Sequence, residues 1–421
     1  MNNNEDNRLK EFRQLKNAVR GSTEHLIVGI DIAKEKHHAF MGTATGKTLL
    51  KKLVFDNTRE GFDTFCLHVN AIKTRYGLGK VVFGLEPTGD YHKPLAEYLL
   101  RQGHMLVLEA GASVKKNREL LDGRWDKHDT KDAANVADLI SQGKSLFYEF
   151  PSADLRELRS LLSLKRRLKK LEQGHKVRIR NHLIAQYFPE LDCYFAKIEG
   201  PAIVKWCLDP KELSTIPFEE FVSVVPEGRR EQRKRLLDIH TKAKTSIGCE
   251  ITPAASFEGK LLVEALRQLH VMIQDADKKI LEVCLRFPEY TFLVSIPGFG
   301  PDISSKVLGA IGNPHRFDNE RQVLKMAGLD LSADRSGKHE SAPVISKKGK
   351  ADLRYGLCQA ALIASTKNDR FKAYFEGRLK GREREKGILG NRRVKLAAKL
   401  LVIAWTLMKK REVFNPDCIT E

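Results

Sequence analysis

The sequence predicts an α/β part followed by a mainly helical part, and three observations predict this class. Short apolar runs separated by polar turns begin at His25, a heptad spacing of leucines follows Pro151, and apolar helical segments follow Pro288. At 421 residues the chain exceeds what one hydrophobic core usually organises, so we expect two or three domains.

The first part has the pattern of a mixed sheet covered by helices. After a flexible N-terminus over 1–24, we expect one domain over 25–150. Its strand-like runs are HLIVGIDIAKE, KHHAFMGT and KTLLKKLVFDN, then VVFGLE and MLVLEA. Helical stretches, REGFDTFCLHVNAIKTRY and YHKPLAEYLLRQ, lie between the later strands, and a third helix starts at about Asp129. The order βββαβαβα places helices over a mixed sheet.

The middle of the chain, 151–287, is expected to contain two long paired helices. Apolar residues recur at heptad spacing in two places. They are Leu161, Leu164, Leu168 and Leu171, and then Leu262, Leu266, Leu269, Ile273, Ala276, Ile280 and Val283. The segment between them, about 188–255, is rich in proline and holds a basic run, and we interpret it as an insertion of unassigned shape.

The last domain, 288–421, begins with TFLVSIPGFGPDISSKVLGAIG and is otherwise mainly helical. A helix, a glycine-bearing turn and a second helix offer backbone N–H groups to a phosphate. We therefore predict a helix-hairpin-helix-like element that contacts a nucleic-acid backbone.

Composition favours a nucleic-acid partner. The net charge is +19, and such a field concentrates polyanions at the surface. No apolar run approaches the roughly 20 residues that cross a bilayer, and the N-terminus lacks the apolar core of a signal peptide, so we expect a cytosolic protein and no membrane partner. The 7 cysteines include no CxxC pair, which argues against a zinc ribbon or a disulfide framework.

Four acids are the candidate catalytic residues. Asp31 lies inside the first apolar strand, and Glu86 ends a later one, at the sheet edge where ligands usually collect. Asp129 and Asp132 are three residues apart on a helix and so share a face. Any one of them could be a surface acid or a helix cap. Together they predict a site for Mg²⁺, or Mn²⁺, that performs phosphodiester chemistry.

Several blocks resemble a known family. GIDIAKEKHHAF, GLEPTGDYHKPLAEYL and KHDTKDAANVADLI look like the catalytic blocks of the DEDD transposases, the insertion-sequence 110 family, which includes the pilin-gene invertases. SIPGFGPDISSKVLGAIG, RFDNERQVLKMAGLD, RSGKHESAPVISKKGKADLR and LGNRRVKLAAKLL resemble the family's second domain in the same order. The resemblance covers about 25–150 and 288–411.

The resemblance implies a specific architecture and reaction. It implies an RNase H-like domain of the RuvC type, a coiled coil, and a helical transposase domain that carries a serine nucleophile, by position Ser336. It also implies a structured noncoding bridge RNA that pairs with donor and target DNA, and assembly as a dimer or tetramer. A serine hydroxyl is a weak nucleophile and needs a metal or a base to activate it.

Basic side chains supply the expected contacts to phosphates. The candidates are Lys165, Arg166, Arg167, Lys169, Lys170, Arg229, Arg230, Arg233, Lys347, Lys348, Arg392 and Arg393. Aromatic residues are not interleaved with these runs, which favours duplex or structured RNA over stacked single strands.

The sequence departs from the family in two places, and other functions stay open. His128 stands where a small hydroxyl residue is expected, and the central segment is longer than in compact members. A metal-dependent nuclease or junction resolvase would use the same acids with water, and a site-specific invertase would use the same serine. A sugar-kinase or actin-like ATPase would share the first strand, but the glycine-rich second phosphate loops that it needs are missing from the sequence. A basic coiled-coil scaffold would need no metal.

Overall fold

The computed structural model describes residues 3–122, 129–195, 208–224, 230–332, 335–336, 339–340 and 344–419. The chain forms two compact units, Met1–Ser152 and Ala153–Glu421. The boundary between the units lies close to the expected domain end at residue 150.

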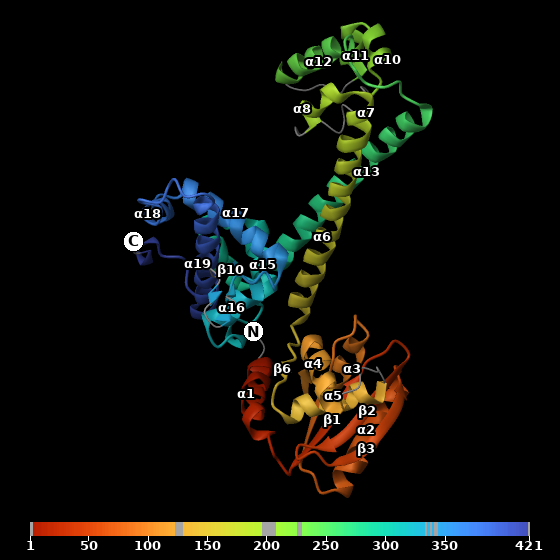
Figure 1. Cartoon of the computed structure of the whole chain (residues 1–421), viewed down its shortest axis with the longest axis vertical. Coiled ribbons are helices and arrows are strands. Elements are labelled where there is room, and N and C mark those ends of the chain that lie inside the picture. The colour runs from red at the N-terminus through yellow and green to blue at the C-terminus, as the bar shows by residue number, and fades with distance from the viewer. Residues whose placement is uncertain are drawn as a thin grey trace. The chain divides into compact units, whose positions relative to one another are not determined.

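The N-terminal unit is built on a six-stranded mixed sheet with the order β3-β2-β1-β4-β5-β6 (Figure 1). The central strands β1, β4 and β5 are parallel, and β2, β3 and β6 are antiparallel to their neighbours. The strands are β1 His25–Asp31, β2 Lys36–Thr43, β3 Thr48–Asp56, β4 Lys80–Leu85, β5 Met105–Leu108 and β6 Leu146–Phe147. The predicted meander followed by crossovers therefore gives a mixed sheet.

Alternating side chains divide the sheet into two buried faces. On one face, Val28 and Phe83 pack with the apolar sides of α2 and α3. On the other face, Ile27 and Val82 pack with α5 and with Phe12 of α1. The helices are α1 Asn3–Ala18, α2 Arg59–Arg75, α3 His92–Arg101, α4 Gly111–Asp122 and α5 Asp129–Ser141.

Two of these helices differ from expectation. The N-terminal segment is not a loose tail, because α1 buries Leu9 and Phe12. Polar residues dominate its composition, so its few apolar side chains gave too weak a pattern to predict packing. Helix α4 was not predicted either, and it precedes the expected third helix.

Two glycines in the sheet allow α5 to lie directly on the central strands. A Cβ atom on Gly29 of β1 would lie 2.1 Å from the carbonyl oxygen of Ala133 and 2.6 Å from the amide nitrogen of Ala137. A Cβ atom on Gly84 of β4 would lie 2.4 Å from a methyl carbon of Ile140. The close packing of α5 therefore requires glycine at position 29, where the obstacle is helix backbone.

The second unit contains a long antiparallel helix pair, α6 Ala153–Arg178 and α13 Pro253–Cys284 (Figure 1). Three ion pairs and one histidine–carboxylate contact along the helix pair fix its register. They are Asp154–Arg286 at 2.9 Å, Lys165–Asp277 at 2.5 Å, Glu172–His270 at 2.8 Å and Arg178–Glu258 at 2.6 Å. Helix α6 continues as a π-helix, Ile179–Ile184, and a short helix, α7 Ala185–Tyr187.

The buried seam confirms the predicted heptads on α13 and only part of those on α6. On α13, every predicted position from Leu266 to Val283 is buried. On α6, Leu161 and Leu168 are half-buried, but Leu164 and Leu171 are exposed, and Glu172 is buried instead. The α6 prediction was wrong at Leu164 and Leu171 because charged residues occupy seam positions beside them, and contacts with α13 compensate these charges.

The segment predicted as an insertion forms a small helical subdomain at the tip of the pair. Its core joins Phe188, Leu213, Phe221 and Ile239 to the ends of α6 and α13. Its described elements are a 3-10 turn Pro189–Leu191, α8 Asp192–Phe195, α10 Pro210–Thr215, α11 Phe218–Val224 and α12 Arg230–Ala243.

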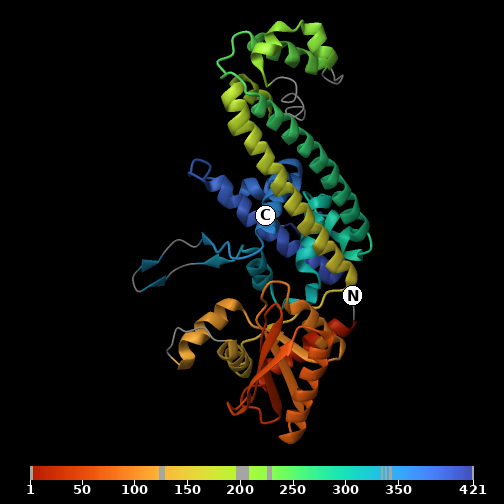
Figure 2. The ribbon, with the colours of Figure 1, turned by 90° about the vertical axis from the view of Figure 1, so that its right-hand side faces the viewer.

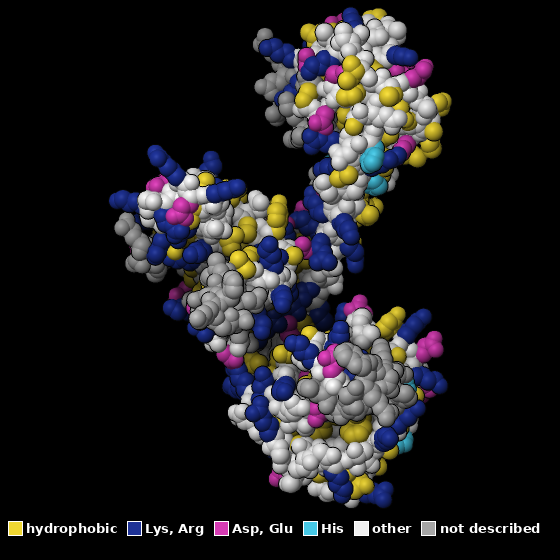
Figure 3. Space-filling view, in the orientation of Figure 1, with side chains coloured by type: hydrophobic (Ala, Val, Ile, Leu, Met, Phe, Trp, Pro, Cys, Tyr) yellow, Lys and Arg dark blue, Asp and Glu magenta, His cyan; other side chains and the backbone are white. Residues whose placement is uncertain are grey.

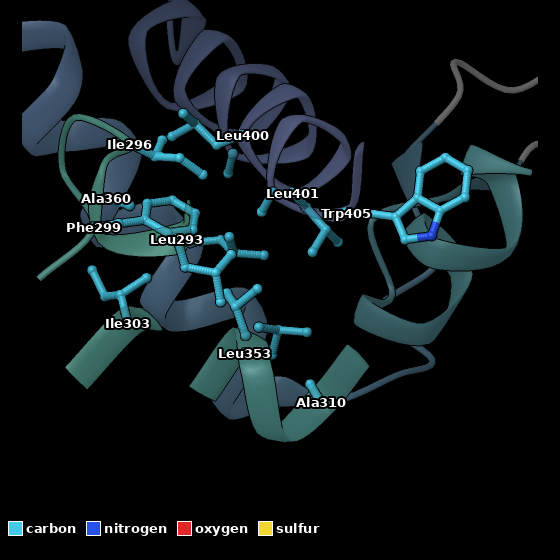
Figure 4. Packing of buried hydrophobic residues seen from close by; sticks show 14 of the residues in the cluster. Leu293, Ile296, Phe299, Ile303, Ala310, Leu353, Ala360, Leu400, Leu401 and Trp405 are labelled. Carbon is cyan, nitrogen blue, oxygen red and sulfur yellow. The ribbon is translucent and has the colours of Figure 1, made fainter. Parts of the chain in front are cut away.

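The C-terminal part of this unit is a helical body with one large apolar core. Figure 4 shows Leu293 of α14, Leu353 of α17 and Leu400 of α19 meeting within this core, together with Phe299 from the turn before α15. The helices are α14 Pro288–Val294, α15 Pro301–Ile311, α16 Glu320–Ala327, α17 Ala351–Lys367, α18 Asp369–Gly377 and α19 Ile388–Lys410, with 3-10 turns at Pro314–Arg316 and Pro416–Cys418. None of the helices among the described residues is long and apolar enough to cross a membrane.

The predicted helix-hairpin-helix-like element is formed by α14 and α15. Its turn packs into the body, because Phe299 is buried and a Cβ atom on Gly298 would lie 2.6 Å from the carbonyl oxygen of Ala360. Gly298 also has a φ of 90°, which favours glycine. Gly300 and Pro301, at the start of α15, stay exposed.

Four short strands lie between α16 and α17, and they project from the helical body in Figure 2. Strand β7 Leu331–Ser332 pairs with β10 Val344–Ile345, and β8 Arg335–Ser336 pairs with β9 His339–Glu340. Among the described residues, Ser336 therefore lies on one strand of a short antiparallel pair.

Candidate carboxylate site

Asp31 and Glu86 lie at the same edge of the N-terminal sheet. Strands β1 and β4 are parallel, and Ile30 pairs with Leu85, so the next residue on each strand is an acid. Asp31 and Glu86 come two residues after Gly29 and Gly84, so by the alternation of a strand they lie on the same sheet face as these glycines, the face that α5 covers. The register therefore brings two acids 55 residues apart in sequence onto neighbouring strand ends and onto one face.

Asp132 is supplied by α5, on that same face. Its neighbour Ala133 contacts Gly29, two residues before Asp31. The Asp132 side chain is 4% exposed, and its Oδ1 lies 2.6 Å from Nη2 of Arg118, a residue of α4. Despite that distance, Oδ1 accepts no hydrogen bond of good geometry.

The fourth predicted acid, Asp129, begins α5, and its side chain lies outside the described residues, as does all of His128. Among the side chains that are described, no three acids, histidines or cysteines lie close enough together to hold a metal ion. The Oε1 atom of Glu86 is 2.7 Å from where a Cβ atom on Gly111 would lie, so this carboxylate reaches the start of α4. The ends of β1 and β4 and the start of α5 thus lie on one face of the sheet, but the described side chains do not form a complete set of metal ligands.

Two further titratable residues stand beside these acids and were not predicted. His38 on β2 is the cross-strand partner of Asp31, and it is half-buried. Glu109 follows β5, where Leu108 pairs with Leu85, so Asp31, Glu86 and Glu109 end three adjacent strands. The run MLVLE carried a signal for Glu109, an acid directly after an apolar strand, like that for Glu86. His38 follows only from the register of the first hairpin.

The residues present fit a hard divalent cation. The predicted ligands are all carboxylates, which suit Mg²⁺ or Mn²⁺. A buried carboxylate oxygen that accepts no hydrogen bond is costly, and Asp132 Oδ1 is such an atom. A cation would satisfy it.

Ser336 lies in the C-terminal unit, on strand β8. Its backbone pairs with that of His339 on β9, and its side chain lies outside the described residues.

The basic residues predicted on α6 fall into two groups. Lys165 is mostly buried, and its Nζ lies 2.5 Å from oxygens of both Asp277 and Asp302. Burial would lower the pKa of Lys165, but the hydrogen bonds that its ammonium group donates to these two carboxylates raise it. Arg166 pairs with Asp352 at 3.2 Å and Lys169 with Glu172 at 3.0 Å, and both stay largely exposed. Arg167 and Lys170 are exposed. Figure 3 shows Lys and Arg side chains along this helix pair.

The remaining predicted contacts are scattered over the same unit. Arg233 pairs with Glu219 at 2.5 Å, and its guanidinium lies over the ring of Phe218. Arg229 and the side chain of Arg230 lie outside the described residues. Lys347 and Lys348 are exposed beside β10, and Arg392 and Arg393 are half-buried on α19. Lys165 is therefore the one among the described candidates whose charge is buried between two acids.

Comparison with known families gives two matches in chain order. A family model named for the DEDD transposase of IS110, with the description "Transposase", matches residues 28–189. A second, described as "Transposase IS116/IS110/IS902 family", matches residues 290–376. The first match covers the sheet and α5, and the second covers α14 to α18.

Individual relatives have related descriptions. The chain is 22% identical to an uncharacterized 44.8 kDa protein of insertion element IS116 from Streptomyces clavuligerus, over 94% of this chain and 98% of that protein. It is 24% identical to the transposase for insertion sequence element IS1111A of Coxiella burnetii, over 69% of each chain. It is 29% identical to putative transposase y4rJ of Sinorhizobium fredii, but that match spans only 45% of this chain and 50% of the relative.

Proposed function

Because the chain belongs to the IS110 family of transposases, we propose that it cuts and rejoins DNA at a divalent-cation site on its N-terminal unit. The ligands would be Asp31, Glu86, Asp129 and Asp132. The register of β1 with β4 carries this proposal, because two acids from distant parts of the sequence end neighbouring strands on the face that α5 covers.

The ion would be Mg²⁺ or Mn²⁺. A cation held by these carboxylates would stabilise the charge that develops on the scissile phosphate. The protein's own contribution is to hold the acids on rigid elements. Asp31 ends central strand β1, Glu86 directly follows central strand β4, and Asp132 belongs to a helix that is in backbone contact with Gly29.

We assign the nucleophile to Ser336 on the family resemblance. Attack of its hydroxyl oxygen on phosphorus would form a Ser–O–P bond, break the bond to the leaving DNA oxygen and pass the hydroxyl proton on, so that the leaving oxygen departs as a hydroxyl group. The phosphate remains an ester throughout, so the reverse attack rejoins DNA without another energy source. A nuclease would instead use water and release both ends.

The partners would be donor DNA, target DNA and a structured noncoding bridge RNA. The net charge of +19 supports polyanion binding. The exposed Arg167, Lys170, Lys347 and Lys348 are the described candidates best placed for phosphate contacts. The buried Lys165 would serve the structure of the helix pair instead.

Self-association as a dimer or tetramer would bring together the several strand cuts that exchange requires. The helix pair offers apolar side chains that it does not use internally. On α13, Val271 is 57% and Met272 is 53% exposed, and on α6 Leu171 is 55% exposed. These side chains support contact with a second copy.

Recombination between a donor and a target plasmid, with the RNA that copurifies, tests the proposal. We expect Asp31→Asn, Glu86→Gln and Asp132→Asn each to lower recombination at least about 100-fold while nucleic-acid binding persists. Asp56→Asn is the matched control, because it removes an exposed acid from β3 of the same sheet. Full activity of the site variants would refute the carboxylate assignment.

A Ser336→Ala variant separates recombination from hydrolysis. We expect it to lose strand exchange and the covalent protein–DNA adduct, detected as a species that survives denaturing electrophoresis. Cleavage by this variant at the wild-type rate would identify a metal-dependent nuclease or resolvase instead.

A further inference from the structure

Arg118 places a positive charge at the buried acid of the proposed cation site. Its side chain is 20% exposed, and that of Asp132 is 4% exposed. A buried carboxylate needs a counter-charge, because desolvation of an isolated ion costs more than a fold can tolerate. Within the described part of the chain, Arg118 supplies this charge, with Nη2 at 2.6 Å from Oδ1.

The contact is close but poorly aligned. Neither Oδ1 of Asp132 nor Nε of Arg118 makes a hydrogen bond of good geometry. Stable arginine–carboxylate pairs usually form two parallel hydrogen bonds, which fix both groups. Charge attraction without that fork leaves Oδ1 available to a better ligand.

The two helices do not depend on Arg118 for their mutual position. The amide of Asn117, on α4, donates hydrogen bonds to Asn135 Oδ1 and Asp138 Oδ2, both at 2.7 Å. Asn135 in turn donates to the carbonyl oxygen of Val114 at 2.6 Å. This buried amide network joins α4 to α5 one turn away from Asp132, so removal of the guanidinium leaves the helices joined.

We propose that Arg118 is an internal counter-ion that competes with the divalent cation for Asp132. Without a cation, the guanidinium neutralises the charge of Asp132. When a cation binds, Oδ1 of Asp132 becomes its ligand, and the Arg118 guanidinium has to move away from this oxygen. Arg118 is then a positioning residue that sets the cation concentration at which the site fills. This inference rests on the proposed cation site.

Direct binding of Mn²⁺ to the full chain in the absence of DNA tests the inference, by calorimetry or by the paramagnetic resonance signal of free Mn²⁺. We expect Arg118→Met to lower the Kd on the order of tenfold, because one competing unit charge is removed. We also expect a lower melting temperature in EDTA, which Mn²⁺ restores. Arg118→Lys keeps the charge and should bind Mn²⁺ as the wild type does.

Lys116→Met is the matched control, because it removes one exposed charge from the same helix. An equal tightening in Lys116→Met would show a general field effect and overturn the competition, as would an unchanged or weaker Kd in Arg118→Met. If the wild type binds no Mn²⁺, the cation site and this inference fall together. If the wild type binds and Asp132→Asn abolishes binding while Arg118→Met changes nothing, only this inference falls.

Discussion

Glu109 should make the N-terminal unit less stable as the pH rises, and Glu109→Gln should remove that effect. The residue is 1% exposed, and its two carboxylate oxygens accept no hydrogen bond of good geometry. Burial raises the pKa of its carboxyl group to about 7, against smaller opposing effects of Ser145 and Lys16. The ordinary pKa of the group is 4.5.

The sign and the size follow from these two pKa values. Below 4.5 the carboxyl group is protonated in both the folded and the unfolded state, so it leaves stability unchanged. Between 4.5 and about 7 the folded state keeps a proton that the unfolded state has lost, so stability falls as the pH rises. Above about 7 the loss is complete and amounts to about 3 kcal/mol, at about 1.4 kcal/mol for each pKa unit.

Chemical unfolding, followed by hydrogen exchange of the peptides that cover β5, measures this effect. We expect the free energy of unfolding of Glu109→Gln, relative to that of the wild type, to be about 2–3 kcal/mol higher at about pH 8 than at about pH 5. The cost of burying the new amide does not depend on pH, so it cancels when the free energies of unfolding at the two pH values are subtracted. Glu119→Gln removes an exposed acid of α4 and should show no such change. A Glu109→Gln effect that is the same at both pH values would refute the buried, protonated acid.

Three further outcomes are expected. Gly29→Ala should destabilise the N-terminal unit by about 2 kcal/mol or more, because the added Cβ atom would clash with the backbone of α5. Gly79→Ala should not, because nothing lies within 4 Å of a Cβ atom there. Thermal unfolding of the two variants tests this. Burial alone would raise the pKa of Glu172, but hydrogen bonds from its cationic neighbours lower this pKa to about 2. The helix pair should therefore lose stability as the pH falls from 4.5 toward 2. Unfolding followed by circular dichroism should show a smaller loss in Glu172→Gln. Lys165→Met should lower the melting temperature and leave RNA affinity unchanged, whereas Arg167→Met should weaken RNA binding, as filter binding can measure.

The sequence was most informative where one local pattern determines the structure. The strand at His25–Asp31 and the run ending at Glu86 were visible as apolar segments that end in acids, and the parallel register then aligned them. The seam of α13 was visible because its apolar residues repeat every seven residues over several turns. In each case side-chain polarity and secondary structure agree.

The sequence was least informative where partners distant in the chain compensate a polar residue. The seam of α6 includes Glu172, because His270 of α13 pairs with it. No local pattern marks such a position as buried, so leucine spacing placed Leu164 and Leu171 in the seam although both are exposed. Arg118 was missed for the same reason, since its importance comes only from Asp132 on another helix. A charged residue at a buried position can be predicted only when it is known which helices or strands pack against each other.

The same structure explains why charge-removing substitutions can be interpreted at this site. The position of α5 is set by backbone contact with Gly29, and the position of α4 is set by the amide of Asn117, so neither depends on the acids. Replacing Asp31 or Asp132 by asparagine keeps side-chain volume and these contacts. Such a change removes charge from a framework that is held in place by contacts outside the site acids. Loss of recombination in these variants, with the hydrogen exchange of α4 and α5 unchanged, would therefore report on cation binding and not on a collapsed fold.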